Sequence, residues 1–222
     1  MSMNKIADFE CPACNYKNNI TIWPTLNATV DPELKEELFS GKLFAKVCPN
    51  CGKVNRFNYT LLYHDMTQKV MIKLDTDREQ AEWSPKSLLG GFPWFPNGDT
   101  VFDGYRFRVV TNVSKLQEKA TIFDCVLDDR IIEILKFFNW KKFNEENPNV
   151  GLSDIFFNRR SSYIFEFFSN HEKTHSSNLN MEAYELINKK ALSAIDYESI
   201  DCFFIGQEWA RSVVEKYFFK HN

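Results

Sequence analysis

Two pairs of cysteines, each separated by two residues, place the strongest constraint on how this chain folds. The first pair lies in Cys11-Pro12-Ala13-Cys14 and the second in Cys48-Pro49-Asn50-Cys51. A two-residue gap lets both sulfurs of one turn reach the same ion, and four thiolates suit the tetrahedral preference of Zn²⁺. The sequence therefore predicts one structural zinc ion per chain, held by Cys11, Cys14, Cys48 and Cys51.

Paired cysteines also serve two other chemistries, redox catalysis and catalysis at a zinc ion. Redox-active Cys-x-x-Cys motifs use one pair at a helix N-terminus, where the helix dipole lowers the thiol pKa. Here two pairs are present and both border strand-like sequence. A catalytic zinc usually has three protein ligands and one open position. Because four cysteines leave no open position, we expect no catalysis at the metal and assign no catalytic residue.

The composition is that of an ordinary globular protein with an unusually aromatic core. The 222 residues are 44% hydrophobic and 26% charged, and 21 of them are Phe. No apolar run reaches the ~18 residues of a membrane-spanning helix, and residues 1–10 lack the apolar centre of a signal peptide. We therefore expect no membrane association and a cytoplasmic location, where a reducing environment favours metal over disulfide for paired thiols.

Short β elements around one helix are predicted for the N-terminal part. Residues 1–8 are interpreted as a loosely packed lead-in, and the alternation over Asn19–Trp23 predicts a short strand that Pro24 ends. An acidic cap, a proline at the first position and a glycine after the end predict a helix over 31–40. Alternating apolar residues around a polar turn predict a β-hairpin within 57–74.

One long helix dominates the prediction for the C-terminal part. Apolar residues at steps of three and four predict a helix over 114–143, with Ser114 and Gln117 as a capping box. The other predicted elements are strands over 105–113, 155–158 and 162–168, a mobile polar segment over 170–180, a helix over 181–194, an edge segment over 201–205 and a helix over 206–219.

Together these elements predict an α+β fold. An N-terminal zinc ribbon with a β-hairpin is joined to a mixed β-sheet packed on the long helix, and a further helix ends the chain. Residues 1–98 would form the zinc-ribbon portion with the hairpin and an aromatic loop, and residues 99–222 would form the α+β portion. Because the segment between them is rich in aromatic residues, we expect the two portions to share one core.

Acidic residues on the predicted long helix form a second candidate site, consisting of Asp124, Asp128, Asp129 and Glu133. Asp129 and Glu133 are four residues apart and share one helix face, where two carboxylates can bind Mg²⁺ for phosphoryl chemistry. We favour a solvated helix face instead, with Arg130 and Lys136 as counter-charges.

Histidines offer two weaker candidates. His64 and Asp65 in the hairpin could act as an acid–base pair, but such residues more often make turn hydrogen bonds. His171 and His175 lie four residues apart and could chelate a metal if their segment were helical, and we interpret them as a surface pair.

The sequence around the second cysteine pair resembles that of a known family. It contains six informative stretches: Val30–Leu34, Gly41–Leu43, Cys48–Gly52, Leu61–Asp65, Leu116–Lys119 and Leu127–Arg130. In these stretches the chain resembles the CpXC family of bacteria and archaea over about residues 9–135. The resemblance implies that the four cysteines are zinc ligands and that the protein is cytoplasmic, and it implies no activity. Asn15 occupies the position in the first pair that Gly52 occupies in the second. This position requires a positive φ, which Asn tolerates better than most residues.

Two functions from different classes remain. The first is a non-enzymatic protein whose zinc-stabilised ribbon docks a protein partner, with Trp83, Trp94 and Phe95 as aromatic anchors. The second is a nucleic-acid-associated zinc-ribbon protein with weak hydrolytic activity at Asp128, Asp129 and Glu133. Basic residues beside aromatic ones, as in 105–108, fit the second. A net charge of −3 favours the first. Neither the partner nor the oligomeric state follows from the sequence.

Overall fold

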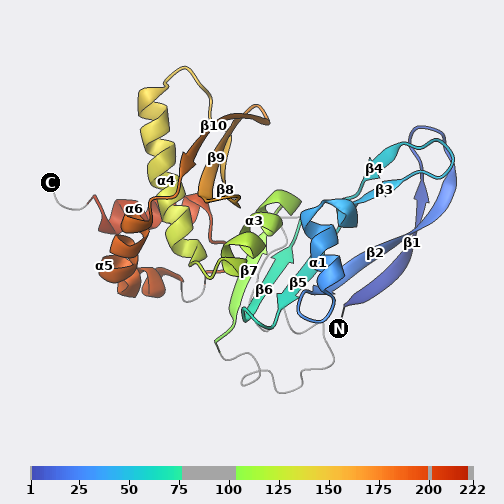
Figure 1. Cartoon of the computed structure of the whole chain (residues 1–222), viewed down its shortest axis with the longest axis horizontal. Coiled ribbons are helices and arrows are strands. Elements are labelled where there is room, and N and C mark those ends of the chain that lie inside the picture. Colours follow the sequence, from blue (N-terminus) through green and yellow to red (C-terminus); the bar gives the residue numbers. More distant parts are fainter. Residues whose placement is uncertain (1, 77–103, 200–201, 220–222) are drawn as a thin grey trace. The chain divides into compact units, whose positions relative to one another are not determined.

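The structure, a computed structural model, describes residues 2–76, 104–199 and 202–219 (Figure 1). The chain forms two compact units, Met1–Gln117 and Glu118–Asn222. Both helices and sheets are present, which confirms the mixed α and β class. The boundary predicted at residues 98–99 and the aromatic side chains of Trp83, Trp94 and Phe95 lie outside the described residues.

A five-stranded mixed sheet organises the first unit. In spatial order its strands are β1 (Met3–Glu10), β2 (Lys17–Asn27), β5 (Leu61–Asp65), β6 (Val70–Leu74) and β7 (Arg106–Val110). The β1–β2 and β5–β6 pairs are antiparallel, whereas β2–β5 and β6–β7 are parallel (Figure 1). The β5–β6 pair confirms the predicted hairpin, and its alternating residues Leu61 and Tyr63 are buried as a one-sided strand requires.

The start of the chain is a strand, which corrects the prediction of a loose lead-in over residues 1–8. β1 pairs with β2 in antiparallel register along its length. The predicted end of the second strand at Pro24 is also wrong, because β2 continues to Asn27. The register shifts between Met3 and Lys5, at the part of β1 that faces Pro24. Such an irregularity accommodates a residue that has no N–H for the ladder.

Between β2 and β5 the chain forms one helix and a small two-stranded ribbon. These elements are α1 (Pro32–Phe39), the short 3₁₀ helix η1 (Lys42–Phe44), β3 (Ala45–Val47) and β4 (Val54–Arg56). The helix predicted over 31–40 is confirmed as α1, and Gly41 ends it with a φ of 76°. Asp31 precedes the helix, but its carboxylate accepts the N–H of Ser2 at 3.0 Å instead of a helix N–H.

The prediction of one long helix over 114–143 is wrong, because this range contains two helices, α3 (Val113–Asp124) and α4 (Asp129–Glu146). Helix α3 ends in a Schellman motif, in which Val126 N–H donates to the Phe123 carbonyl and Leu127 N–H to the Ile122 carbonyl. Val126 has a φ of 56°, a left-handed conformation that glycine usually takes. No glycine therefore marks this helix end in the sequence.

Polar side chains start both of these helices. The side chain of Asn112 accepts the N–H of Lys115 at 2.9 Å at the beginning of α3, in the place where Ser114 was the predicted cap. Asp128 caps α4 by accepting the N–H of Arg130 at 2.9 Å. The boundary between the two units falls within α3.

In its described residues, the second unit consists of an antiparallel sheet, the C-terminal half of α3 and further helices around one core. Its remaining elements are β8 (Asp154–Arg159), β9 (Tyr163–Ser169), β10 (Glu172–Asn178), α5 (Met181–Ser199) and α6 (Gln207–Tyr217). The sheet has the order β10-β9-β8. Buried side chains of α4, β9 and α6, including Ile131, Phe165 and Val213, belong to a single cluster.

Three features of the second unit differ from the sequence prediction. Its sheet is antiparallel, and the mixed sheet lies in the first unit because β7 pairs with β6. β10 replaces the mobile segment predicted over 170–180, because it continues the sheet beside β9. No strand forms over residues 202–205, the described part of the predicted edge segment.

Candidate metal centre

Four cysteine sulfurs meet in the first unit. The Sγ atoms of Cys11, Cys14, Cys48 and Cys51 all lie within 4.8 Å of one another. Cys11 Sγ lies 3.8 Å from Cys51 Sγ, and Cys14 Sγ lies 3.7 Å from Cys48 Sγ. Within the described residues, no other group of three or more His, Cys, Asp or Glu side chains is arranged to hold a metal ion.

Both cysteine pairs lie in matching turns, which we call the first knuckle (Cys11–Asn15) and the second knuckle (Cys48–Gly52). The N–H of Asn15 donates to the Cys11 carbonyl at 2.8 Å, and the N–H of Gly52 donates to the Cys48 carbonyl at 2.9 Å. The φ angles are 55° at Asn15 and 73° at Gly52, so Asn15 has the positive φ predicted for it. The two knuckles thus share one backbone shape although their sequences differ at this position.

Each knuckle closes a pair of strands. The N–H of Cys11 donates to the Tyr16 carbonyl at 3.0 Å, which continues the ladder of β1 and β2. The N–H of Cys48 donates to the Lys53 carbonyl at 2.8 Å, which continues the antiparallel ladder of β3 and β4. The backbone of two separate hairpins therefore fixes where the sulfurs lie.

Local hydrogen bonds favour the thiolate at two positions. The backbone N–H of Ala13 is the main cause that lowers the pKa of Cys11 to about 6, and hydrogen bonds with the neighbouring thiols lower it further. Burial acts in the opposite direction. The side chain of Asn50 and the N–H of Tyr16 lower the pKa of Cys14. Thiolates are the metal-binding form of cysteine, so these contacts prepare the first knuckle for a cation.

Cys51 behaves differently from the other cysteines of the cluster. The N–H of Lys53 stabilises its thiolate, but hydrogen bonds with the neighbouring cysteines and desolvation raise its pKa to about 11. Its side chain is exposed, whereas Cys11 and Cys48 are buried. The cluster therefore has a closed side within the protein and an open side at Cys51, through which an ion can enter.

The distances fit a tetrahedral ion. Four thiolates placed about 2.3 Å from a central Zn²⁺ form a regular tetrahedron whose edges are about 3.8 Å long. Two of the sulfur pairs are separated by 3.8 and 3.7 Å. The residues present can therefore accommodate a tetrahedral metal with little movement.

Asn55 is a buried contact of the cluster that sequence reasoning missed. Its Nδ2 donates to Cys11 Sγ at 3.8 Å and to the Lys53 carbonyl at 3.2 Å. It lies on β4 opposite Lys46 of β3, four residues beyond Cys51. No sequence signal marks it, because alternation with Val54 would place Asn55 on the polar face, whereas the structure exposes Val54 and buries Asn55.

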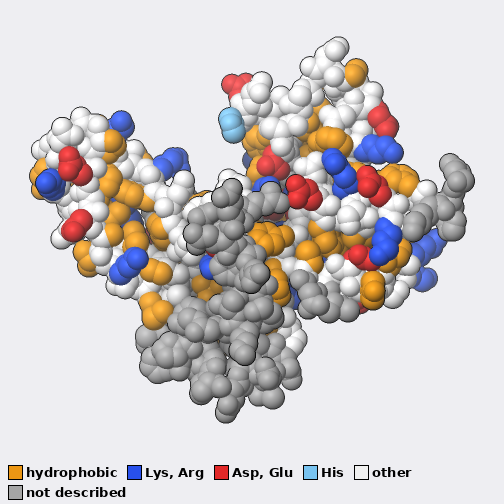
Figure 2. Space-filling model, turned by 180° about the vertical axis from the view of Figure 1, so that it is seen from behind, with side chains coloured by type: hydrophobic (Ala, Val, Ile, Leu, Met, Phe, Trp, Pro, Cys, Tyr) orange, Lys and Arg blue, Asp and Glu red, His pale blue; other side chains and the backbone are white. Residues whose placement is uncertain are grey.

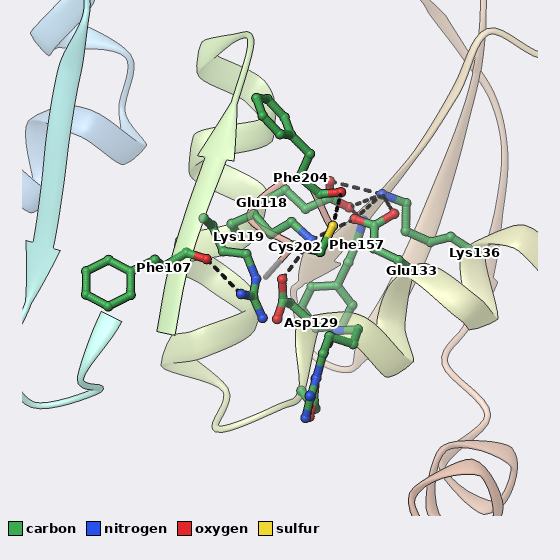
Figure 3. A network of polar contacts seen from close by, with 12 residues as sticks. Phe107, Glu118, Lys119, Asp129, Glu133, Lys136, Phe157, Cys202 and Phe204 are labelled. Atoms are coloured by element: carbon green, nitrogen blue, oxygen red, sulfur yellow. Dashed lines mark hydrogen bonds and ion pairs between the residues drawn. The ribbon is translucent and has the colours of Figure 1, made fainter. Parts of the chain in front are cut away.

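The acidic cluster on α4 is an internal ion-pair network (Figure 3). Lys119 Nζ of α3 lies 3.0 Å from both Asp129 Oδ2 and Glu133 Oε1. Asp129 and Glu133 are 0% and 3% exposed, so the interpretation as a solvated helix face is wrong for these two residues. Their carboxylates face inward because α3 folds back on α4 after the break at Val126 and brings Lys119 to them.

Lys136 joins a further carboxylate to the network (Figure 3). Its Nζ lies 2.8 Å from Glu118 Oε1 and 3.2 Å from Glu133 Oε2, which confirms Lys136 as a counter-charge. Burial raises the pKa of Glu118 although Lys136 opposes this, whereas at Glu133 the two lysines outweigh burial and lower the pKa. The N–H of Phe157 on β8 also donates to Glu118 at 2.6 Å, so the network ties α3, α4 and the sheet together.

Asp128 remains at the surface side of α4. Its carboxylate pairs with Arg130 at 2.6 Å, which confirms that predicted counter-charge. Arg130 also reaches Asp196 of α5 at 2.7 Å. Asp128 therefore caps and links helices, and it does not share a site with the inward-facing carboxylates of Asp129 and Glu133.

The histidine candidates do not meet in a common site. Asp65 accepts the N–H groups of Thr67 and Gln68, which is the turn role predicted for it, while His64 Nε2 contacts Tyr105 Oη at 3.1 Å. The ring of His175 lies on β10 against Phe167, with 5.2 Å between ring centroids. His171 precedes β10 in a turn with a φ of 67°.

Of three comparisons with known proteins, one finds a match. A family model described as CpXC protein matches residues 9–136. Neither the comparison with curated proteins nor that with solved structures gives a match. Among the described residues, no helix is long and apolar enough to cross a membrane.

Proposed function

The chain belongs to the CpXC family, and from this premise we propose that Cys11, Cys14, Cys48 and Cys51 hold one structural zinc ion. The observation that carries the proposal is the convergence of four Sγ atoms within 4.8 Å from two knuckles far apart in sequence. Four soft thiolates with tetrahedral spacing select Zn²⁺ over Mg²⁺ or Ca²⁺, which prefer oxygen ligands. Four protein ligands leave no position for a substrate, so the ion has a structural role.

The ion would join two hairpins that belong to different sheets. The first knuckle ends the β1–β2 hairpin and the second ends the β3–β4 ribbon. The β3–β4 ribbon has three residues in each strand, which is too short for stability on its own. Metal binding thus supplies the folding energy of a zinc ribbon, as in small metal-stabilised domains.

We propose further that this zinc-stabilised ribbon binds a protein partner. Val47 and Val54 stand opposite each other on β3 and β4 and are 63% and 56% exposed. Tyr16 beside the first knuckle is also exposed. Exposed apolar side chains on a rigid ribbon provide contact area for another protein. Paired thiols that hold zinc fit a reducing compartment, so we propose a cytoplasmic location.

The nucleic-acid and hydrolase alternative has less support. Carboxylate-based hydrolysis needs accessible oxygens for Mg²⁺, but Asp129 and Glu133 are buried and paired with Lys119. The proposal therefore contains no catalytic role. Binding to a labelled single strand that weakens steeply with salt would favour the nucleic-acid alternative.

Native mass spectrometry of protein purified without chelator tests the metal proposal. We expect a mass excess of one zinc ion per chain, lost in Cys48→Ser and retained in Cys125→Ser. Cys125 is a matched control because it is a free cysteine outside the cluster. A chain without metal whose mass is lower by the hydrogens of two disulfides would overturn the proposal and favour the redox alternative.

A further inference from the structure

A small groove lies beside the second knuckle in the first unit. Its volume is about 250 Å³. One wall consists of residues 18–21 of β2, and the other contains Lys46 and Val47 of β3. Cys48 and Pro49 close one end. The groove therefore lies between two strands that belong to different ladders, and the metal centre forms one of its boundaries.

The β2 wall presents an open strand edge. Cys11 N–H bonds to the Tyr16 carbonyl, so hydrogen-bonded pairs recur at every second residue along β1 and β2. This alternation turns the N–H and C=O groups of Lys17, Asn19 and Thr21 away from β1. On that side β5 pairs with β2 only from Thr25 onward, and no other described strand pairs there.

At this edge the side chain of Asn18 accepts a backbone hydrogen bond that a neighbouring strand would otherwise accept. Its side-chain Oδ1 accepts the N–H of Asn19 at 2.8 Å. That N–H points away from β1 and would donate to a carbonyl if another strand lay beside it. The side-chain oxygen can rotate away at little cost, because it is a local contact between adjacent residues. The N–H of Asn19 is therefore satisfied in the free protein and is still accessible to an added strand.

The groove is basic in a chain that is acidic overall. Lys46 is the charged residue of its lining, which contains no Asp or Glu. The two hairpins that carry the knuckles, residues 3–27 and 45–56, hold five basic and two acidic residues, against a net charge of −3 for the chain. Glu10 stands opposite Lys17, which leaves the positive charge on the β3–β4 side. Figure 2 shows basic and hydrophobic side chains intermixed with a few acidic ones at this end of the first unit, at the left of that view.

We propose that this groove binds an extended, acidic segment of a partner protein by adding it as a strand to the free edge of β2. Main-chain groups of Asn19 and Thr21 pair with the segment, and Lys46 pairs with one of its carboxylates. The exposed Val47 provides apolar contact at the opposite wall. This inference rests on the proposed metal centre, because the ion would fix the distance between β2 and β3.

A nucleic-acid strand fits these features less well. Single-stranded nucleic acid needs a row of cations and aromatic faces for successive bases. The lining includes the aromatic residues Phe9 and Tyr16, but it has a single lysine in place of a row of cations. Its wall of main-chain donors and acceptors matches a peptide backbone.

The test uses the zinc-loaded full chain as bait for a displayed library of random peptides. Enriched peptides are synthesised with a fluorescent label, and their Kd is measured by anisotropy. Thr21→Pro removes an edge N–H that points away from β1, so it blocks strand addition without removing a β1–β2 hydrogen bond. Lys46→Glu reverses the charge in the groove. Lys5→Glu on β1 makes the same charge change away from the groove and is the matched control.

We expect acidic peptides that bind wild type and Lys5→Glu equally and lose about tenfold in affinity with Thr21→Pro and with Lys46→Glu. Failure of the zinc-loaded chain to enrich any peptide would overturn the proposal and leave the metal centre intact. Equal binding by all variants would also overturn it, as would binding of a labelled single-stranded oligonucleotide at this edge in place of peptides. If a chain that holds no metal binds the peptides and Thr21→Pro weakens this binding, strand addition at β2 is supported. The requirement for zinc is then overturned.

Discussion

The amide nitrogen of Asn55 lies 3.8 Å from the sulfur of Cys11, and both side chains are buried. Through this contact β4 supports a sulfur that belongs to the other hairpin. A donor held against a thiolate stabilises its negative charge and fixes its orientation. Outer contacts of this kind tune metal affinity in many proteins.

Asn55→Leu is therefore expected to weaken zinc binding about tenfold, because leucine has a similar size but no N–H to donate. Competition with a chromophoric chelator measures the affinity. Asn149→Leu makes the same substitution at an exposed position of the second unit and should leave the affinity unchanged. Wild-type affinity in a folded Asn55→Leu variant would show that the contact has no influence on the metal.

Lys136→Met is expected to destabilise the protein by about 3–5 kcal/mol, because it leaves the buried carboxylate of Glu118 without its cation. The double variant with Glu118→Gln should recover part of this loss, since the amide can still accept the N–H of Phe157. Urea unfolding measures both effects. Lys142→Met breaks an exposed pair on the same helix and should cost less than about 0.5 kcal/mol. Similar losses in Lys136→Met and Lys142→Met would contradict the buried network.

Val126→Gly is expected to stabilise the protein by about 0.5–1 kcal/mol. The left-handed conformation of Val126 is costly for a β-branched residue and free of strain for glycine. Its side chain is 79% exposed, so little packing is lost. Val30→Gly, at another exposed position without a positive φ, should lower the urea midpoint instead. A lower midpoint for Val126→Gly would argue against the helix break at this residue.

Glu166 gives a prediction for pH dependence. Burial opposes its ionisation, but Lys173 and Asn158 bind the carboxylate and lower its pKa below the ordinary value. The folded state therefore holds the proton less tightly than the unfolded state. The resulting stability is present above the unfolded pKa of about 4.3 and is lost as the pH falls through the lower folded value.

Glu166→Gln should accordingly be less stable than wild type at pH 7, and the difference should shrink on acidification. Urea midpoints at a series of pH values measure this. Glu172→Gln on the neighbouring strand β10 removes an exposed carboxylate and should show no such trend. A difference between Glu166→Gln and wild type that grows on acidification would reverse the sign of the argument.

Features that depend on neighbouring residues in sequence were predictable. The knuckles, the positive φ at Asn15, the helix α1 and the β5–β6 hairpin follow from cysteine spacing, capping residues and alternation. Each is stabilised mainly by contacts within a short stretch, so the local pattern contains the necessary information. The four candidate ligands were identified in the same way.

Tertiary structure alone decided the remaining features. A continuous apolar stripe runs through α3 and α4, and the Schellman motif that divides them has Val126 where glycine would have marked the break. The same break brings Lys119 to Asp129 and Glu133. In one straight helix these two carboxylates would have remained in water. Asn55 meets Cys11 across 44 positions of sequence, and the free edge of β2 exists only because β5 pairs with a part of it. The sequence by itself determined which groups can bind a metal. Burial and strand pairing determined which polar groups face each other, because both depend on contacts between residues that are distant in the chain.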